Sequence, residues 1–196
     1  MGIARKPTQS ATTCLTYDEY LREGEITYRY DIIDGVRVVP PAPRTLHQVI
    51  LMNLSYSLEL YRRNGGLARP LSAPVDVLIS RAPLRVRQPD IILISTASYR
   101  QRNVRTIRGP IEFAPELVIE IASDSDRKKV LEGKIADYAS IGVQECWVVR
   151  PEDETVEVLT LHGQRMLAVA QYLPTQQIHC LVFPDLHVLV DDIFAD

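Results

Sequence analysis

A series of short, apolar segments constrains the fold of this chain more than any other feature of its sequence. The segments span residues 74–80, 89–95, 116–122, 145–149 and 155–161. The first three are rich in apolar and β-branched residues and are expected to be interior strands. In the second and third of them, apolar residues fall on both faces of an extended strand, so these strands should be covered on both sides. The last segment alternates and should pair with the one before it as a hairpin. The chain is therefore expected to build a sheet with a buried interior.

Helical patterns separate these segments. Thr16 and Glu19 have the spacing of a capping box, which predicts a short N-terminal helix. Apolar residues at spacings of three and four predict a helix over residues 46–61 and another over residues 126–140. The basic stretch 98–108 has little apolar content and is expected to be a loop.

A hairpin precedes the first long helix. Asp34-Gly35 lies between two β-rich pieces and is typical of a tight turn, because both residues tolerate positive φ. The order of elements predicts an α/β domain with a mixed β-sheet flanked by helices and with an N-terminal helix and β-hairpin. Residues 1–15 are expected to form a flexible tail, and residues 16–196 a single domain.

Composition argues against several classes of protein. The chain has 22 Lys and Arg against 25 Asp and Glu, a net charge of −3, so a nucleic-acid contact would have to be a local basic patch. Three cysteines, far apart and without a CxxC pair, argue against a disulfide scaffold or zinc finger and favour a reduced, cytoplasmic setting. No segment approaches the roughly 20 apolar residues of a membrane span, so no membrane partner is expected.

Acidic residues inside the apolar strands are the first candidates for chemistry. Asp90 and Glu120 each lie in a strand that is apolar on both faces, and Asp76 repeats the pattern. A carboxylate there is costly to desolvate unless it is paired or binds a cation. Two or three such acids meeting at neighbouring strand ends would suit Mg²⁺ or Mn²⁺. Each acid could instead bond to loop backbone or to an arginine.

Lys134 adds a further candidate. On the expected helix it lies one turn before Tyr138 and beside the apolar stripe. Its side chain could extend outward into water. It could also reach a strand carboxylate, where a lysine can orient a water or stabilise charge on a phosphate.

Taken in order, the motifs resemble one known family. They are YDIIDG (30–35), PPAP (40–43) with His47-Gln48, PVDV (74–77), QPDIILI (88–94), ELVIEIAS (116–123), Lys134 with Tyr138, and GVQECW (142–147). This set resembles the Uma-type restriction endonuclease family, formerly a domain of unknown function, within the PD-(D/E)XK nuclease superfamily. The resemblance covers roughly residues 16–195.

The resemblance implies a restriction-endonuclease-like core and a metal site. Asp90, Glu120 and the backbone carbonyl of Ile121 would hold Mg²⁺ or Mn²⁺. The lysine that usually stands two residues after the glutamate is replaced by Ala122 and would be supplied by Lys134. His47, Asp76 and Tyr138 are expected to line the same pocket, although a histidine at a helix start can equally be a solvated or capping residue.

The implied activity is divalent-metal-dependent hydrolysis of DNA phosphodiester bonds by an endodeoxyribonuclease acting as a homodimer. Asp90, Glu120 and Lys134 would be the catalytic residues. The basic stretch could contact DNA through its four arginines or could be a solvated loop; the arginines are Arg100, Arg102, Arg105 and Arg108.

The sequence departs from the family pattern in three places, and the two lost acids together with the acidic net charge favour an alternative. Val36 and Val130 stand where the family has acids, and Ser123-Asp124-Ser125 replaces Ser-Pro-Ser. The alternative is a catalytically impaired nuclease fold that binds DNA or protein.

Overall fold

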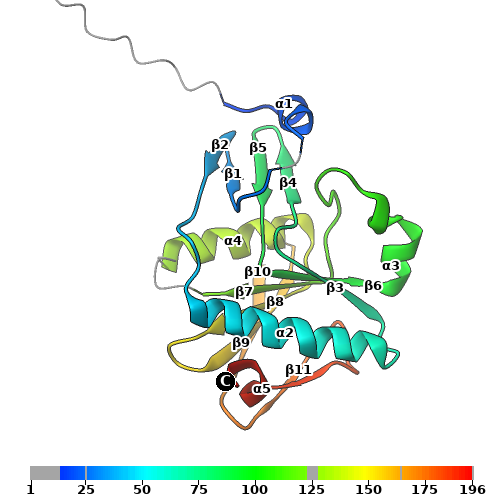
Figure 1. The fold of residues 1–196 in the computed structure, drawn as a ribbon, viewed down its shortest axis with the longest axis vertical. Coiled ribbons are helices and arrows are strands. Elements are labelled where there is room, and N and C mark those ends of the chain that lie inside the picture. Colours follow the sequence, from blue (N-terminus) through cyan, green and yellow to red (C-terminus); the bar gives the residue numbers. More distant parts are fainter. Residues whose placement is uncertain (1–13, 25, 123–127, 164, 196) are drawn as a thin grey trace, which may run out of the picture.

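The protein, described by a computed structural model over residues 14–24, 26–122, 128–163 and 165–195, is built around a six-stranded mixed sheet (Figure 1). Neighbouring strands follow the order β10-β9-β8-β7-β6-β3, and all pairs are antiparallel except β7 and β8. These strands are β3 (Ala68–Ser72), β6 (Ile91–Ser95), β7 (Leu117–Ile121), β8 (Glu145–Arg150), β9 (Thr155–His162) and β10 (Arg165–Tyr172).

Helices cover both faces of this sheet. Helix α2 (Thr45–Arg63) packs with α5 (Val190–Phe194) over one face, in a core that contains Ile91, Leu93 and Ile119. Helix α4 (Lys128–Ile141) packs over the other face, in a core that contains Ile92, Ile94 and Val118. Figure 1 shows α2 and α4 on opposite sides of the strands. The predicted α/β architecture, and the two-sided burial of β6 and β7, are confirmed.

The parallel pair β7 and β8 is connected through α4. Parallel neighbours need a crossover connection, and a helix that crosses over packs back on the sheet face. The crossover therefore brings α4 over the face of β7 that carries Val118 and Glu120. The Ser123-Asp124-Ser125 segment, which replaces Ser-Pro-Ser of the family, lies outside the described residues.

A smaller sheet stands at one end of the large one, with strand order β2-β1-β5-β4. Asp34 and Gly35 both have positive φ, 51° and 79°, as the predicted hairpin turn requires. The capping box of Thr16 and Glu19 is also present, on α1 (Tyr17–Arg22). The strands are β1 (Asp31–Ile33), β2 (Val36–Val38), β4 (Val77–Arg81) and β5 (Leu84–Arg87).

Some expectations differ from the structure. Strand β4 lies at the edge of the small sheet, so the prediction of an interior strand over residues 74–80 is wrong. Strands β3 and β5 were not predicted from the sequence. The expected basic loop contains α3 (Thr96–Gln101) and a 3₁₀ turn (Val104–Thr106). Leu15 donates a backbone hydrogen bond to Gly35, whereas residues 1–13 of the expected tail lie outside the described part.

The C-terminal part adds a short hairpin of β11 (Gln177–His179) and β12 (His187–Leu189). Among the described residues, no helix is both long enough and apolar enough to cross a membrane.

The three thiols are expected to differ in reactivity. Cys14 is exposed, whereas burial raises the pKa of the Cys146 thiol and raises that of Cys180 to about 12. Because the thiolate is the reactive form, Ellman's reagent at pH 8 should label one thiol rapidly in the native protein and three after denaturation. A Cys14→Ser variant should show no rapid labelling. Rapid labelling of two thiols in the native wild type would contradict this.

Candidate functional site

Asp90 and Glu120 lie next to each other on adjacent strands. Strands β6 and β7 pair with Ile91 opposite Ile119, so continuing the register by one residue sets Asp90 opposite Glu120. Both side chains are buried, with 1% and 2% exposure. Oδ2 of Asp90 accepts a hydrogen bond from the backbone N–H of Ile121 at 2.7 Å. The sheet therefore holds the two acids together, as the positions of the acids in the apolar strands suggested.

Two cationic or polar side chains face the other oxygen of Asp90. Nη1 of Arg29 donates to Oδ1 at 2.6 Å, and Nε2 of His47 lies 3.2 Å from the same atom. Although burial opposes ionisation, the hydrogen bond from His47 and the charge of Arg29 hold the pKa of Asp90 below its ordinary value. Nδ1 of His47 is buried and, within the described part of the chain, has no hydrogen-bond partner.

Glu120 is held by two side chains of α4. Nζ of Lys134 donates to Oε2 at 2.8 Å, and the hydroxyl of Tyr138 donates to Oε1. The four-residue spacing puts both donors on one helical face. Burial and the nearby Asp90 raise the pKa of Glu120, although Lys134 opposes this shift. Lys134 thus reaches a strand carboxylate and does not extend into solvent.

A pocket of about 670 Å³ leads to this centre. Its lining includes Arg29, His47, Asp90, Ile121 and Lys134. Val130 also lines it, and one wall is the proline-rich segment 38–43. Glu120, Tyr138 and Val36 are not among the lining residues. The expectation that Tyr138 lines the pocket is therefore wrong, because this tyrosine is fully buried with its hydroxyl on Glu120.

Asp76 does not line this pocket. It lies just before β4 in the small sheet, where it accepts hydrogen bonds from the hydroxyls of Tyr20 and Tyr30 and from the amide of Gln88. The expectation that Asp76 lines the pocket is wrong, because its carboxylate is turned towards Tyr20, Tyr30 and Gln88. Its carboxylate has a structural role, since it holds α1 through Tyr20 and the segment before β1 through Tyr30.

A buried network of charged side chains lies next to the site and was not predicted from the sequence. Nε of Arg87 donates to Asp137 on α4 at 2.7 Å, and Nη1 donates to Asp31 at 2.8 Å. Arg85 bonds to the other oxygen of Asp137 at 2.8 Å. The signal in the sequence was the alternation of Arg85 and Arg87 in an apolar stretch, which places both on one strand face. The network ties α4, and hence Lys134, to the small sheet.

The four arginines proposed to contact DNA lie away from the pocket. They follow β6, whereas Asp90 precedes it, so the five residues of this strand, about 16 Å, separate the two. The guanidinium of Arg102 stacks over Phe113, 4.3 Å from the ring centroid. None of the four arginines lines either described pocket.

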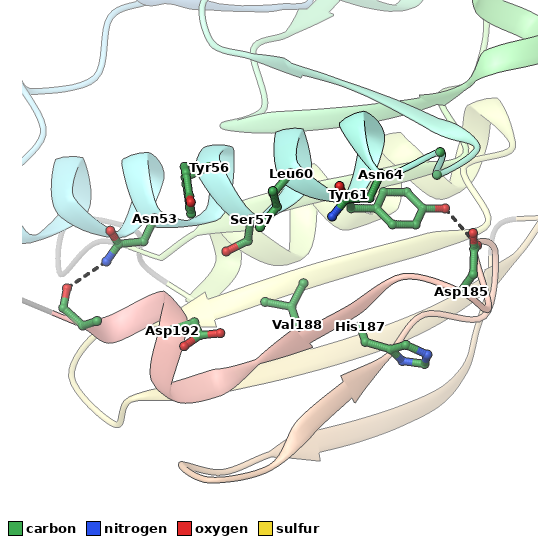
Figure 2. Close-up of a pocket in the computed structure, with 13 residues that line it drawn as sticks. Asn53, Tyr56, Ser57, Leu60, Tyr61, Asn64, Asp185, His187, Val188 and Asp192 are labelled. Atoms are coloured by element: carbon green, nitrogen blue, oxygen red, sulfur yellow. Dashed lines mark hydrogen bonds between the residues drawn. The ribbon is translucent and has the colours of Figure 1, made fainter.

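A second pocket, of about 650 Å³, lies between α2 and the C-terminal segment (Figure 2). Its lining includes Asp185 and Asp192 and contains no Lys or Arg among the described residues. Tyr61 donates a hydrogen bond to Asp185 across one end. An acidic lining repels a phosphate, whereas the first pocket is lined by four cationic side chains, Arg29, Arg44, Arg87 and Lys134. The first pocket is therefore the candidate active site.

The fold is one already seen in a nuclease-like structure. Five chains of solved structures match this chain, among them one described as "a putative nuclease belonging to DUF820" from Anabaena variabilis. That match has a TM-score of 0.75 at 20% identity and covers 92% of this chain and 97% of the other. No curated protein matches.

A family model identifies the chain more closely. The model of the Uma2 family, described as "Putative restriction endonuclease", matches residues 16–191. The chain belongs to this family, which confirms the resemblance drawn from the sequence motifs.

Proposed function

We propose that this protein is a divalent-metal-dependent endonuclease that hydrolyses DNA phosphodiester bonds. The observation that carries the proposal is the pair of buried carboxylates, Asp90 and Glu120, set side by side by adjacent strands, with Lys134 on Glu120. Membership of a family described as restriction endonucleases supports it. The test is cleavage of supercoiled plasmid DNA with Mg²⁺ or Mn²⁺.

The donor chemistry at the site fits a hard cation. Asp90, Glu120 and the backbone carbonyl of Ile121 would supply oxygen ligands, which Mg²⁺ and Mn²⁺ prefer. Among the described residues, no three His, Cys, Asp or Glu side chains are grouped to hold a metal ion, so the two carboxylates are the anionic donors. A bound ion would neutralise charge on the phosphate and acidify a water.

The chain's own groups have separable roles in this proposal. Lys134 would orient the attacked phosphate or stabilise its developing charge, because it lines the pocket and its ammonium lies beside Glu120. The Tyr138 hydroxyl holds the Glu120 carboxylate in place. Arg29 neutralises Asp90 and lines the pocket, where it can also attract an anionic phosphate.

A specific observation favours a second candidate, a nuclease fold that binds DNA or protein without cutting. Arg29 and Lys134 already pair with the two carboxylates, and Val130 lines the pocket where the family has an acid. In this second function, Arg29 and Lys134 would stay paired with Asp90 and Glu120, and no metal ion would bind between the two acids.

Titration calorimetry with Mn²⁺ separates these candidates. Wild type should bind Mn²⁺, and Glu120→Gln should weaken binding by on the order of tenfold or more. Arg29→Met should strengthen binding severalfold, because it removes the cation that competes for Oδ1 of Asp90. Arg100→Met, at the far end of β6, is the matched control and should bind as wild type does. Absence of Mn²⁺ binding by wild type would favour the binding module.

We also propose that the protein is a homodimer in which each copy carries one acidic pair, the assembly that the family resemblance implies. Light scattering on the purified protein should give twice the mass of the chain, 22.2 kDa. A monomeric mass would contradict the homodimer without bearing on the acidic pair.

A further inference from the structure

The buried acidic pair is reached through a pocket of limited volume. Asp90 and Glu120 are almost completely buried, and the pocket that reaches Asp90 has a volume of about 670 Å³. Pockets of roughly 300–1,000 Å³ hold molecules the size of one or two nucleotides. Duplex DNA is a stiff rod with a persistence length of about 50 nm, so it cannot bend into such a space. A nucleotide that leaves the base stack can enter a pocket of this kind.

The walls of the pocket suit an unstacked nucleotide. Tyr28 lines it, is half exposed, and packs its ring edge-to-face on Tyr30. The proline-rich wall, with Pro40, Pro41 and Pro43, adds apolar surface. Aromatic side chains beside cationic ones are the features with which proteins bind single strands, because every base has a face that can stack. Here the cations Arg29 and Lys134 lie at the Asp90 side of the pocket.

The same wall should resist widening to admit a duplex. Proline has a fixed φ, so a segment with three prolines has few alternative backbone conformations. The segment is bounded by β2, which pairs with β1, and by the start of α2. Both ends are therefore fixed to ordered elements.

We infer that the nucleic acid reaches the acidic pair as an unpaired strand, with a base against Tyr28 and the proline-rich wall and its phosphate towards Arg29 and Lys134. This inference rests on the proposed nuclease function for its cleavage step. Its binding step can be measured alone.

Fluorescence anisotropy in EDTA, with the full chain, tests the binding step. The probes are a labelled 30-nucleotide single strand and the blunt duplex of the same sequence. The single strand should bind at least tenfold more tightly. Tyr28→Ala should weaken that binding by about five- to a hundredfold, and Tyr28→Phe should retain it. Tyr56→Ala is the matched control, since Tyr56 is an exposed tyrosine in the acidic pocket (Figure 2).

The outcomes distinguish this inference from the proposed function. Equal or tighter binding of the duplex, or an unchanged Tyr28→Ala variant, would overturn the inference even if the protein cuts DNA. Preferential binding of the single strand that depends on Tyr28 would support it even if no substrate were cleaved. With Mg²⁺ or Mn²⁺ added, an unpaired strand or flap should be cut faster than the matched duplex.

Discussion

Replacing Glu120 by glutamine should reduce metal-dependent DNA cleavage by about a hundredfold or more, with little change in the fold. Glutamine has the shape of glutamate and can still accept the Tyr138 hydrogen bond, but it lacks the negative charge that pairs with Lys134 and would hold a cation. The measurement is the rate of nicking of supercoiled plasmid with Mg²⁺ or Mn²⁺, together with the thermal midpoint of each protein.

The matched control for this experiment is Glu157→Gln. Glu157 is also a strand glutamate paired with a cation, Arg150, but it lies on β9 away from the pocket. The control should cleave at the wild-type rate. If wild type and Glu120→Gln cleave equally, the activity does not come from the acidic pair, and a contaminating nuclease or another site must account for it.

The largest effect on stability is expected at Arg87. Arg87→Met leaves the buried Asp137 with Arg85 alone and removes the guanidinium from the partly buried Asp31, so both carboxylates lose an ion-pair partner. Breaking a buried ion pair in this way costs about 3–5 kcal/mol. The free energy of unfolding, measured by urea denaturation, should fall by that amount.

The control for Arg87 is Arg150→Met, which breaks the half-exposed ion pair with Glu157. Such pairs contribute about 0–1 kcal/mol, so this variant should lose little stability. If both variants lose the same free energy of unfolding, burial of the Arg87 network adds nothing to stability beyond an exposed ion pair. The network fixes α4, so Arg87→Met should also perturb the position of Lys134.

The central part of the site could be predicted because its signals are local. Asp90 and Glu120 stand out as acids in short apolar strands, and the spacing of Lys134 and Tyr138 puts both on one helical face. The register of β6 and β7 then places Asp90 opposite Glu120, so no contact between distant loops is needed to bring the two acids together. Their roles in catalysis stay predictions.

The surroundings of the site could not be predicted because they depend on contacts between distant segments. Arg29 lies 61 residues before Asp90, in the β-rich piece that precedes the predicted hairpin turn, and its contact follows from how the small sheet sits against the large one. Asp76 was misplaced for the same reason, since an apolar segment does not reveal which of two sheets it joins. The Asp137 network likewise joins β5 to α4.

The hydrogen bond from the Ile121 N–H to Asp90 has a consequence for how this protein could be re-engineered. The carboxylate of Asp90 accepts the bond that a main-chain carbonyl would otherwise accept, just before the start of β6, so strand pairing sets the spacing of the acids. Segment 38–43, in contrast, belongs to a connection between β2 and α2. Grafting a different connection there should change which molecules enter the pocket, while the geometry of the two acids is preserved.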